Sequence, residues 1–365
     1  MSIVQAGPEA ISEQSERPED VSPERIAETV ANLTKSLDRS LKHINDINRQ
    51  ARLLSLNARI EASRASGDGG AAFGVVAQAM SELSVQTDRV ATELGERSRE
   101  SISRLELMNR LLATNFRGIR LSDLALTNID LIDRNLYERS CDVRWWATDN
   151  SVVDALTSRT NEDYQHASRR LGVILDSYTV YFDLVLCDTR GVVVANGRPG
   201  RYVSVGSNQA HSAWFQSAIE SQSGAEFGFQ SVHESQLANR QRVLVYSCAV
   251  REGGDVNGKP IGVLGIIFNW DALAQTIVEN VPLAAHEKER TRVCITDDQG
   301  LILADSSGRQ LKEVLVIPNR ELLCREAKNF VIAELGMQQC CVAHARAPGF
   351  ETYTTGWHSF LIYEC

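Results

Sequence analysis

The strongest constraint on this chain is an apolar pattern that stops at a glycine-rich segment and then resumes. In residues 30–58, apolar side chains recur at alternating spacings of three and four, which is typical of a coiled-coil seam. The pattern stops at residues 66–70, Ser-Gly-Asp-Gly-Gly, where successive glycines permit left-handed backbone and end a helix. The seam residues are Val30, Leu33, Leu37, Ser40, Ile44, Ile47, Ala51, Leu54 and Ala58 before the glycines, and Val76, Met80, Leu83, Thr87, Val90 and Leu94 after them. The sequence therefore predicts an antiparallel coiled-coil hairpin with its tip near 66–70.

The hairpin has a clear predicted beginning. Ser22 is a suitable N-cap, Pro23 suits the first helical position, and Glu24 complements the helix dipole. Residues 1–21 are rich in Glu, Ser, Gln and Pro, so they are predicted to be a disordered lead. We assign the hairpin to residues 22–120. Two helices alone bury little apolar surface, so we expect a homodimer in which two hairpins form a four-helix bundle.

The remainder of the chain changes character twice. Residues 121–180 carry no glycine or proline before Gly172, which predicts one long connecting helix that includes Trp145 and Trp146. Strand-like runs then dominate, and the strand, turn, strand opening of residues 182–195 recurs at residues 292–304. We therefore predict an α+β multidomain protein with two similar units, residues 181–280 and 281–365.

Composition excludes several classes of protein. The net charge of -9 argues against nonspecific nucleic-acid binding, which needs a basic face. No stretch reaches the 18 or so apolar residues of a membrane span, and the acidic N-terminus lacks the features of a signal peptide. The eight cysteines include no C-x-x-C pair, which favours reduced, mostly buried thiols. We expect a cytoplasmic protein.

No catalytic or metal-binding pattern stands out. Ser, His and Asp all occur, but the sequence has neither a nucleophile elbow nor a Cys/His signature. Five of the seven histidines stand alone in the sequence with no metal-ligand spacing: His211, His233, His286, His344 and His358. We therefore expect no enzyme activity, no cofactor and no metal.

The hairpin tip resembles the signalling tip of methyl-accepting chemotaxis proteins. The matching residue types, in order, are Leu53, Leu54, Leu56, Asn57, Ala58, Glu61, Ala62, Arg64, Phe73, Val75, Val76 and Ala77. A plain helical hairpin needs apolar seam positions but not this string. The chain departs from the family at Arg49, at Ala51-Arg52 and at Gly70-Ala71-Ala72, and added charge at a packed rim changes which tips associate.

The resemblance implies a partner-binding tip that holds a chemotaxis histidine kinase and its coupling adaptor, and that contacts other chemoreceptors. Leu53 and Leu56 would lie on the exposed apolar face that binds the kinase and other tips. Glu61 and Arg64 would join polar contacts between dimers. Val75 and Val76, on the returning arm, would lie near the adaptor surface, and Asn57 and Phe73 are further members of the partner-binding tip.

The C-terminal units resemble a double Cache sensor domain, in which a PAS-like α+β unit binds a small molecule. The matching segments are residues 182–196, 214–221, 262–273 and 293–306. Amino-acid-binding members place an Arg just before a Trp-Tyr pair, whereas this chain has Ser212 and then Trp214-Phe215. The resemblance therefore does not imply an amino-acid ligand.

A pocket is predicted in the segment 181–280, the first of the two C-terminal units. Its six residues are Arg201, His211, Trp214, Phe215, Phe229 and Tyr246. The alternative is that the aromatic members belong to the core. Together the two resemblances imply a chemoreceptor-like signal transducer that senses an unknown small molecule and regulates a chemotaxis-type kinase. The alternative function is a scaffold or decoy that joins receptor arrays without switching the kinase.

Overall fold

The computed structural model describes residues 23–64 and 68–365. The chain divides at Phe116 into two compact units, 1–116 and 117–365. The predicted disordered lead, 1–21, lies outside the described residues, and so do Ser66 and Gly67 of the predicted tip.

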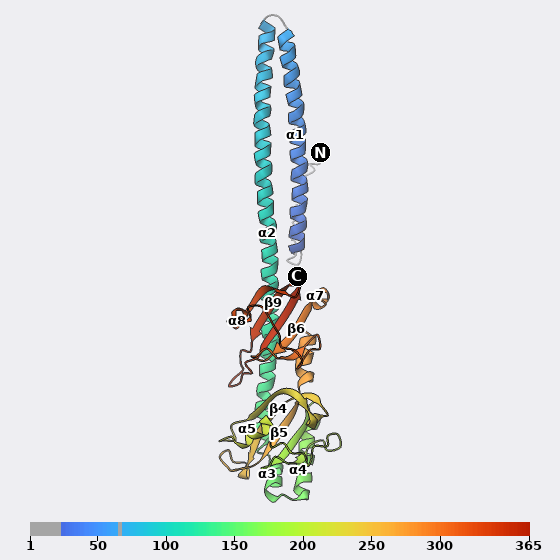
Figure 1. The fold of residues 1–365 in the computed structure, drawn as a ribbon, viewed down its shortest axis with the longest axis vertical. Helices are drawn as coiled ribbons and strands as arrows, with labels where there is room; N and C mark the ends of the chain where they lie inside the picture. The colour runs from blue at the N-terminus through green and yellow to red at the C-terminus, as the bar shows by residue number, and fades with distance from the viewer. Residues whose placement is uncertain (1–22, 65–67) are drawn as a thin grey trace, which may run out of the picture. The chain divides into compact units, whose positions relative to one another are not determined.

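Two long helices form the first unit, where they lie side by side (Figure 1). They are α1, Pro23–Arg64, and the first part of α2, Asp68–Trp146. The Ser55 hydroxyl donates to the Ala77 carbonyl at 2.7 Å, and the Asn48 amide donates to the Ser84 carbonyl at 3.0 Å. Partners on α2 fall in sequence as those on α1 rise, so the helices are antiparallel. The predicted hairpin is confirmed, with Gly69 and Gly70 in the first turn of α2.

The contact between the arms lies elsewhere than predicted. Most of the buried positions are small or polar and repeat every seven residues, with Asn48 and Ser55 on α1 following the buried Leu41. Ala77, Ser84 and Ala91 face them on α2. Several predicted seam residues are exposed instead: Leu33, Ile47, Leu54, Val76, Leu83, Val90 and Leu94. Small side chains let two helices approach closely, so the arms meet along these positions and leave most of the large apolar seam residues outside, with Val30 as a buried exception.

The predicted single helix over 121–180 is wrong, because polar caps break it. Helix α2 ends at Trp146, and α3, Asn150–Ser158, follows. The Asp149 side chain accepts a hydrogen bond from the Ser151 backbone N–H and caps α3. Thr160 caps α4, Asn161–Ser177, in the same way. Capping by Asp and Thr starts new helices without any glycine or proline.

The two tryptophans that we placed within that helix stand at the C-terminal end of α2. Trp146 is buried, and its ring meets those of Tyr178 and Tyr181 edge-on at 5.4 and 5.6 Å. Trp145 is 71% exposed.

Two five-stranded antiparallel sheets follow, and they have the same strand order. The first is ordered β2-β1-β5-β4-β3 and the second β7-β6-β10-β9-β8. The strands of the first sheet are β1 Tyr181–Asp188, β2 Val193–Asn196, β3 Gly228–Ser235, β4 Gln241–Arg251 and β5 Pro260–Asn269. Those of the second are β6 Thr291–Thr296, β7 Ile302–Asp305, β8 Lys328–Leu335, β9 Gln338–Arg346 and β10 His358–Glu364. The shared order confirms the internal repeat predicted from the strand, turn, strand openings.

Short helical segments occupy the connections. They are α5 Ala213–Ile219, η2 Gln236–Ala238, η3 Glu252–Gly254, η4 Asp271–Gln275, α6 Thr276–Glu279, α7 Ala285–Lys288 and α8 Arg320–Leu323. Trp214 lies in α5, and η3 lies in the connection between β4 and β5.

The main core lies between the second part of α2 and one face of each sheet. Leu121, Ala125, Ile129, Ile132 and Leu136 are all fully buried on α2, at spacings of three and four that form one helix face. The other face of each sheet has a smaller core of its own, under α5 in the first sheet and under α8 in the second. Every sheet is therefore covered on both faces.

Polar contacts fix α2 to the second sheet and its loops. Arg120 donates two hydrogen bonds to the Glu287 carboxylate, at 2.6 and 2.8 Å. Asp133 is fully buried and accepts hydrogen bonds from the backbone N–H groups of Gly349 and Thr355, at 2.9 and 3.1 Å. In residues 23–64 and 68–365, the structure has no helix with the length and hydropathy that a bilayer crossing requires.

Candidate functional site

The predicted partner-binding tip carries a cluster of exposed apolar side chains. We call Leu53, Leu56, Phe73, Val75 and Val76 the tip surface. Their exposed fractions run from 53% for Leu56 to 70% for Val75. Large apolar side chains that remain in water at one end of a helical hairpin are physical grounds for a protein contact.

The predicted polar members of the tip are exposed too. Asn57 lies on the surface of α1. Glu61 and Arg64 form an ion pair at 3.3 Å with both side chains at least 70% exposed. An ion pair this exposed contributes little to stability, so both groups remain available to a partner.

A groove of about 250 Å³ lies along the hairpin, between residues of α1 and α2. Its walls are mostly predicted seam residues, namely Ile44, Ile47, Ala51, Met80, Leu83 and Thr87, and it is closed by Asn48 and Ser84. Asn48 and Ser84 bond to each other directly, since the Ser84 hydroxyl donates to the Asn48 side-chain oxygen at 2.5 Å. The groove therefore has apolar walls and a polar floor, and no other described residue of the hairpin covers it.

Charge near the tip is partly neutralised within the hairpin. Arg52, a departure from the family pattern, reaches across to α2, where its guanidinium donates to the Ser84 hydroxyl at 3.1 Å and to Asp88 at 3.0 Å. The arginine thus links the two arms by polar contacts at the hairpin surface.

The six residues of the predicted ligand pocket do not form one site. Trp214 and Phe215 are buried on one face of the first sheet, where they pack with the aliphatic side chains of its central strands. Tyr246 is buried on the opposite face, and Phe229 packs beside it with a ring separation of 5.3 Å. Successive residues of a strand point to opposite faces, so Tyr246 and its core neighbour Val245 cannot line one cavity. The aromatic residues belong to the core.

The two remaining members of that prediction lie at the surface. Arg201 is exposed and stacks on the ring of Tyr202 at 5.3 Å, and His211 is exposed just before α5. The space that Tyr246 and Phe229 were expected to leave for a ligand is filled by the β9–β10 connection. Tyr353 from this connection hydrogen-bonds the Tyr246 hydroxyl. Sequence reasoning missed this contact because 107 residues separate the partners.

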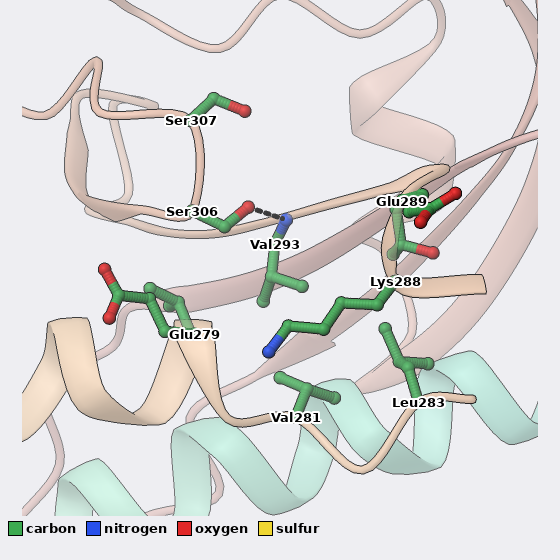
Figure 2. A pocket seen from close by; sticks show the side chains of 10 residues that line it. Glu279, Val281, Leu283, Lys288, Glu289, Val293, Ser306 and Ser307 are labelled. Carbon is green, nitrogen blue, oxygen red and sulfur yellow. Dashed lines mark hydrogen bonds between the residues drawn. The ribbon is translucent and has the colours of Figure 1, made fainter. Parts of the chain in front are cut away.

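The structure instead shows an open cavity of about 540 Å³ beside β6 in the second unit (Figure 2). Val281, Leu283 and Val293 form an apolar part of the lining, and Lys288 and Glu279 bring charged groups to it. The Ser306 hydroxyl has a structural role, because it accepts a hydrogen bond from the Val293 backbone N–H at 2.9 Å. Glu289 adds a second carboxylate, and a cavity with a cation, two carboxylates and an apolar part suits a small polar molecule. No sequence motif marked it.

Two histidines that stand alone in the sequence are brought together by the second sheet. His344 Nε2 and His358 Nδ1 lie 2.7 Å apart, and the Cys324 thiol lies beside them. The prediction that these histidines are isolated is therefore wrong. Their 14-residue separation hides the contact, which depends on the pairing of β9 with β10.

Comparisons with known proteins bear on both units. Residues 5–109 match the family model of the methyl-accepting chemotaxis protein (MCP) signalling domain. The search of curated proteins found no match.

Among solved structures, the sensory domain of the Campylobacter jejuni chemoreceptor Tlp3 (CcmL) is 15% identical, with a TM-score of 0.51 over 69% of this chain and 94% of that one. The ligand-binding domain of the Pseudomonas fluorescens chemoreceptor CtaA, in complex with L-leucine, is 14% identical over 68% of this chain and 94% of that one, with a TM-score of 0.46. The sensor domain of the Vibrio cholerae histidine kinase DctB is 15% identical over 71% and 97%, with a TM-score of 0.44. The α+β fold of this part of the chain is thus similar to the fold of the Tlp3 domain.

Proposed function

We propose that this chain is a chemoreceptor-type signal transducer whose hairpin tip binds a chemotaxis histidine kinase and its coupling adaptor. The observation that carries the proposal is the tip surface: its five apolar residues are exposed. They lie within the segment that matches the MCP signalling domain. Burial of a Val, Leu or Phe side chain contributes about 1.5–3 kcal/mol, so a partner that covers even two of them gains substantial affinity.

The same hairpin would pair with a second copy of this chain. The groove on the hairpin is lined by apolar residues of both helices, and Leu83 is 64% exposed and Ile47 53% exposed in the single chain. A coiled-coil pattern that is conspicuous in sequence but exposed in a single hairpin is what one half of a four-helix bundle presents. Two hairpins that meet along their grooves would bury these residues. Contacts with the tips of other chemoreceptors would then use the tip surface.

The second unit would sense a small molecule, with the cavity beside β6 as the candidate binding site. Lys288 would donate to an acceptor on the ligand and Glu279 would accept from a donor, while Val281 contacts an apolar part. Helix α2 contributes residues to both units, since its bounds are Asp68–Trp146. Ligand binding transmits a signal only if it favours one of two arrangements of such an element.

A pair of valines on α2 provides the test of the tip. Val75 is 70% exposed within the tip surface, and Val85 is 60% exposed on the same helix outside it and outside the groove lining. We expect Val75→Glu to raise the concentration of the chain that gives half-maximal kinase control by about 30-fold. This change corresponds to the roughly 2 kcal/mol lost when one apolar contact becomes a buried charge. Val85→Glu should behave as the wild type.

The measurement is the autophosphorylation rate of a purified chemotaxis kinase with its adaptor, titrated with the full chain. If the two variants change kinase control equally, the tip surface is not the site that binds the kinase and its adaptor. A wild-type chain that binds kinase and adaptor but leaves the rate unchanged would favour the scaffold or decoy function. The proposed cytoplasmic location is tested by cell fractionation. The proposed sensing is tested by the thermal shift of the full chain against small metabolites, because a bound ligand raises the apparent stability.

A further inference from the structure

Three potential metal ligands converge on the outer face of the second sheet, and nothing in the proposed signalling function uses them. The Cys324 thiol, one nitrogen of His344 and one nitrogen of His358 all lie within 4.8 Å of one another. His344 is fully buried, His358 is 7% exposed and Cys324 is half-buried. We call these three residues the Cys-His-His cluster.

The sheet register explains why the two imidazoles meet. His344 on β9 pairs with Phe360 on β10, and His358 stands two residues before Phe360. The histidines are therefore diagonal neighbours on one face, a separation that long side chains span. Phe360 and Val342 belong to the core on this face, and Leu323 of α8 packs onto it. Cys324 follows Leu323 directly as the C-cap of α8, which places its thiol over the histidine pair.

Burial shifts the pKa of all three side chains of the cluster. Burial lowers the pKa of His344 to about 3, with further lowering by His358, and burial lowers that of His358 to about 4, with further lowering by Arg320. A metal binds an imidazole through a ring nitrogen that carries no proton. Burial raises the pKa of the Cys324 thiol, so a metal would have to displace its proton into solvent.

We propose that the Cys-His-His cluster binds a divalent transition-metal ion of the zinc class, through Cys324 Sγ, His344 Nε2 and His358 Nδ1. One thiolate and two imidazoles are ligands that favour zinc and its neighbours and disfavour calcium and magnesium, which take oxygen ligands. Three protein ligands leave the fourth tetrahedral position open to water or to a small molecule.

The cluster needs only small adjustments to reach tetrahedral geometry. Zinc bonds of about 2.0–2.1 Å to nitrogen and 2.3 Å to sulfur require roughly 3.4 Å between the two nitrogens and 3.6 Å between nitrogen and sulfur. The nitrogens are now 2.7 Å apart, as partners in a hydrogen bond, so they would separate by well under 1 Å. Cys324 belongs to a connection rather than a strand, and it can approach the histidines without disturbing the sheet.

Two nearby arginines lower the affinity of the Cys-His-His cluster for a metal cation. Arg320 and Arg346 both act on the histidines electrostatically and oppose a second positive charge. Arg320 is held in place by backbone carbonyls, since it donates to Asp297 O at 3.4 Å and to Asp298 O at 3.2 Å. The thiolate that forms on metal binding would offset one of these positive charges.

Cobalt provides the direct test, because a cobalt–thiolate bond absorbs light that free Co²⁺ and imidazole complexes do not. The full chain, stripped of metal by a chelator, is titrated with Co²⁺ and then with Zn²⁺. We expect a thiolate-to-cobalt band that saturates at one ion per chain and disappears as Zn²⁺ displaces Co²⁺. Cys324→Ser should abolish the band, and Cys365→Ser, which changes an exposed thiol, should keep it. A missing band, or one that survives Cys324→Ser, would overturn the proposal.

A second measurement needs no variant and therefore does not depend on how a substituted chain folds. At free Zn²⁺ of 100 times the dissociation constant, about 1% of the sites are empty, so alkylation of Cys324 should slow about 100-fold. Cys141 is also half-buried and lies outside the cluster, so its alkylation rate is the internal control. Equal rates at Cys324 with and without Zn²⁺, measured by peptide mass spectrometry, would contradict metal binding there.

Discussion

Asp133→Asn should destabilise the second unit more than any surface carboxylate change on the same helix. Asp133 is fully buried on α2. One carboxylate oxygen accepts from the Thr355 backbone N–H at 3.1 Å and from the Thr355 hydroxyl at 2.7 Å. The other accepts from the Gly349 backbone N–H at 2.9 Å and from the Thr354 hydroxyl at 3.4 Å. The carboxylate therefore holds the whole β9–β10 connection against α2.

The magnitude follows from these four bonds. Asparagine replaces one acceptor oxygen by an NH₂ donor, and a hydroxyl can rotate to accept from it, whereas a backbone N–H cannot. One buried backbone N–H then loses its partner, at about 1–3 kcal/mol, and the bonds on the remaining oxygen lose their charge assistance. A total of about 3 kcal/mol corresponds to a fall of about 6–12 °C in melting temperature for a unit of this size.

Tryptophan fluorescence is the assay, because all five tryptophans lie beyond Phe116 and report on the second unit alone. Asp130→Asn is the matched control. Asp130 is half-buried and pairs at 2.7 Å with the exposed Arg134 one turn further along the same helix, and such pairs contribute about 0.3–0.5 kcal/mol. Equal melting temperatures for the two variants would refute the assignment of Asp133 as the buried anchor of the connection.

Two further predictions concern α2. Gly118→Ala should lower the melting temperature although alanine is the better helix former, because its Cβ would lie 2.2 Å from the ring of Phe330, and overpacking costs about 1–3 kcal/mol. Gly74→Ala, with no atom within 4 Å, should leave stability equal or higher by circular dichroism, and a stabilising Gly118→Ala would contradict the packing. Hydrogen bonds from Arg120 lower the pKa of Glu287 to about 2, so their contribution is complete above the ordinary value of 4.5 and is lost as pH falls towards 2. The stability difference between wild type and Arg120→Gln, from urea midpoints, should therefore shrink on acidification, and a difference independent of pH would contradict the ion pair.

The sequence predicted the architecture where a local pattern determined it. The hairpin follows from a heptad pattern interrupted by glycines, and the repeated sheets follow from strand, turn, strand openings at 182–195 and 292–304. The break after Trp146 was missed because we looked for glycine and proline, although Asp149 is as effective a signal when it caps a new helix. The inner contact of the hairpin was missed because it uses Asn48 and Ser84, which an apolar pattern does not mark.

The site was harder to predict because its residues meet only through tertiary structure. The exposure of the tip surface was expected from residue types at one end of a hairpin. The candidate pocket around Tyr246 failed because strand alternation and a distant partner, Tyr353, decide what its ring contacts. The Cys-His-His cluster depends on the register of β9 and β10, and on a loop that returns to them. No local spacing encodes either arrangement.

The shared strand order has a consequence for how the two halves of the second unit can change. In each half, the longest connection runs from the second strand to the third, over 197–227 and 306–327. Each carries the helix that covers the outer face of its own sheet: α5 brings Trp214 to the first, and α8 brings Leu323 and Cys324 to the second. Replacing one such segment would keep the pairing among the five strands of its sheet and would remove backbone hydrogen bonds of the segment to the edge strand, such as that from the Val193 N–H to the Ser207 carbonyl in the first half and that from the Ile302 N–H to the Glu313 carbonyl in the second. New chemistry can therefore arise in one half by exchange of its covering segment while the other half stays as it was.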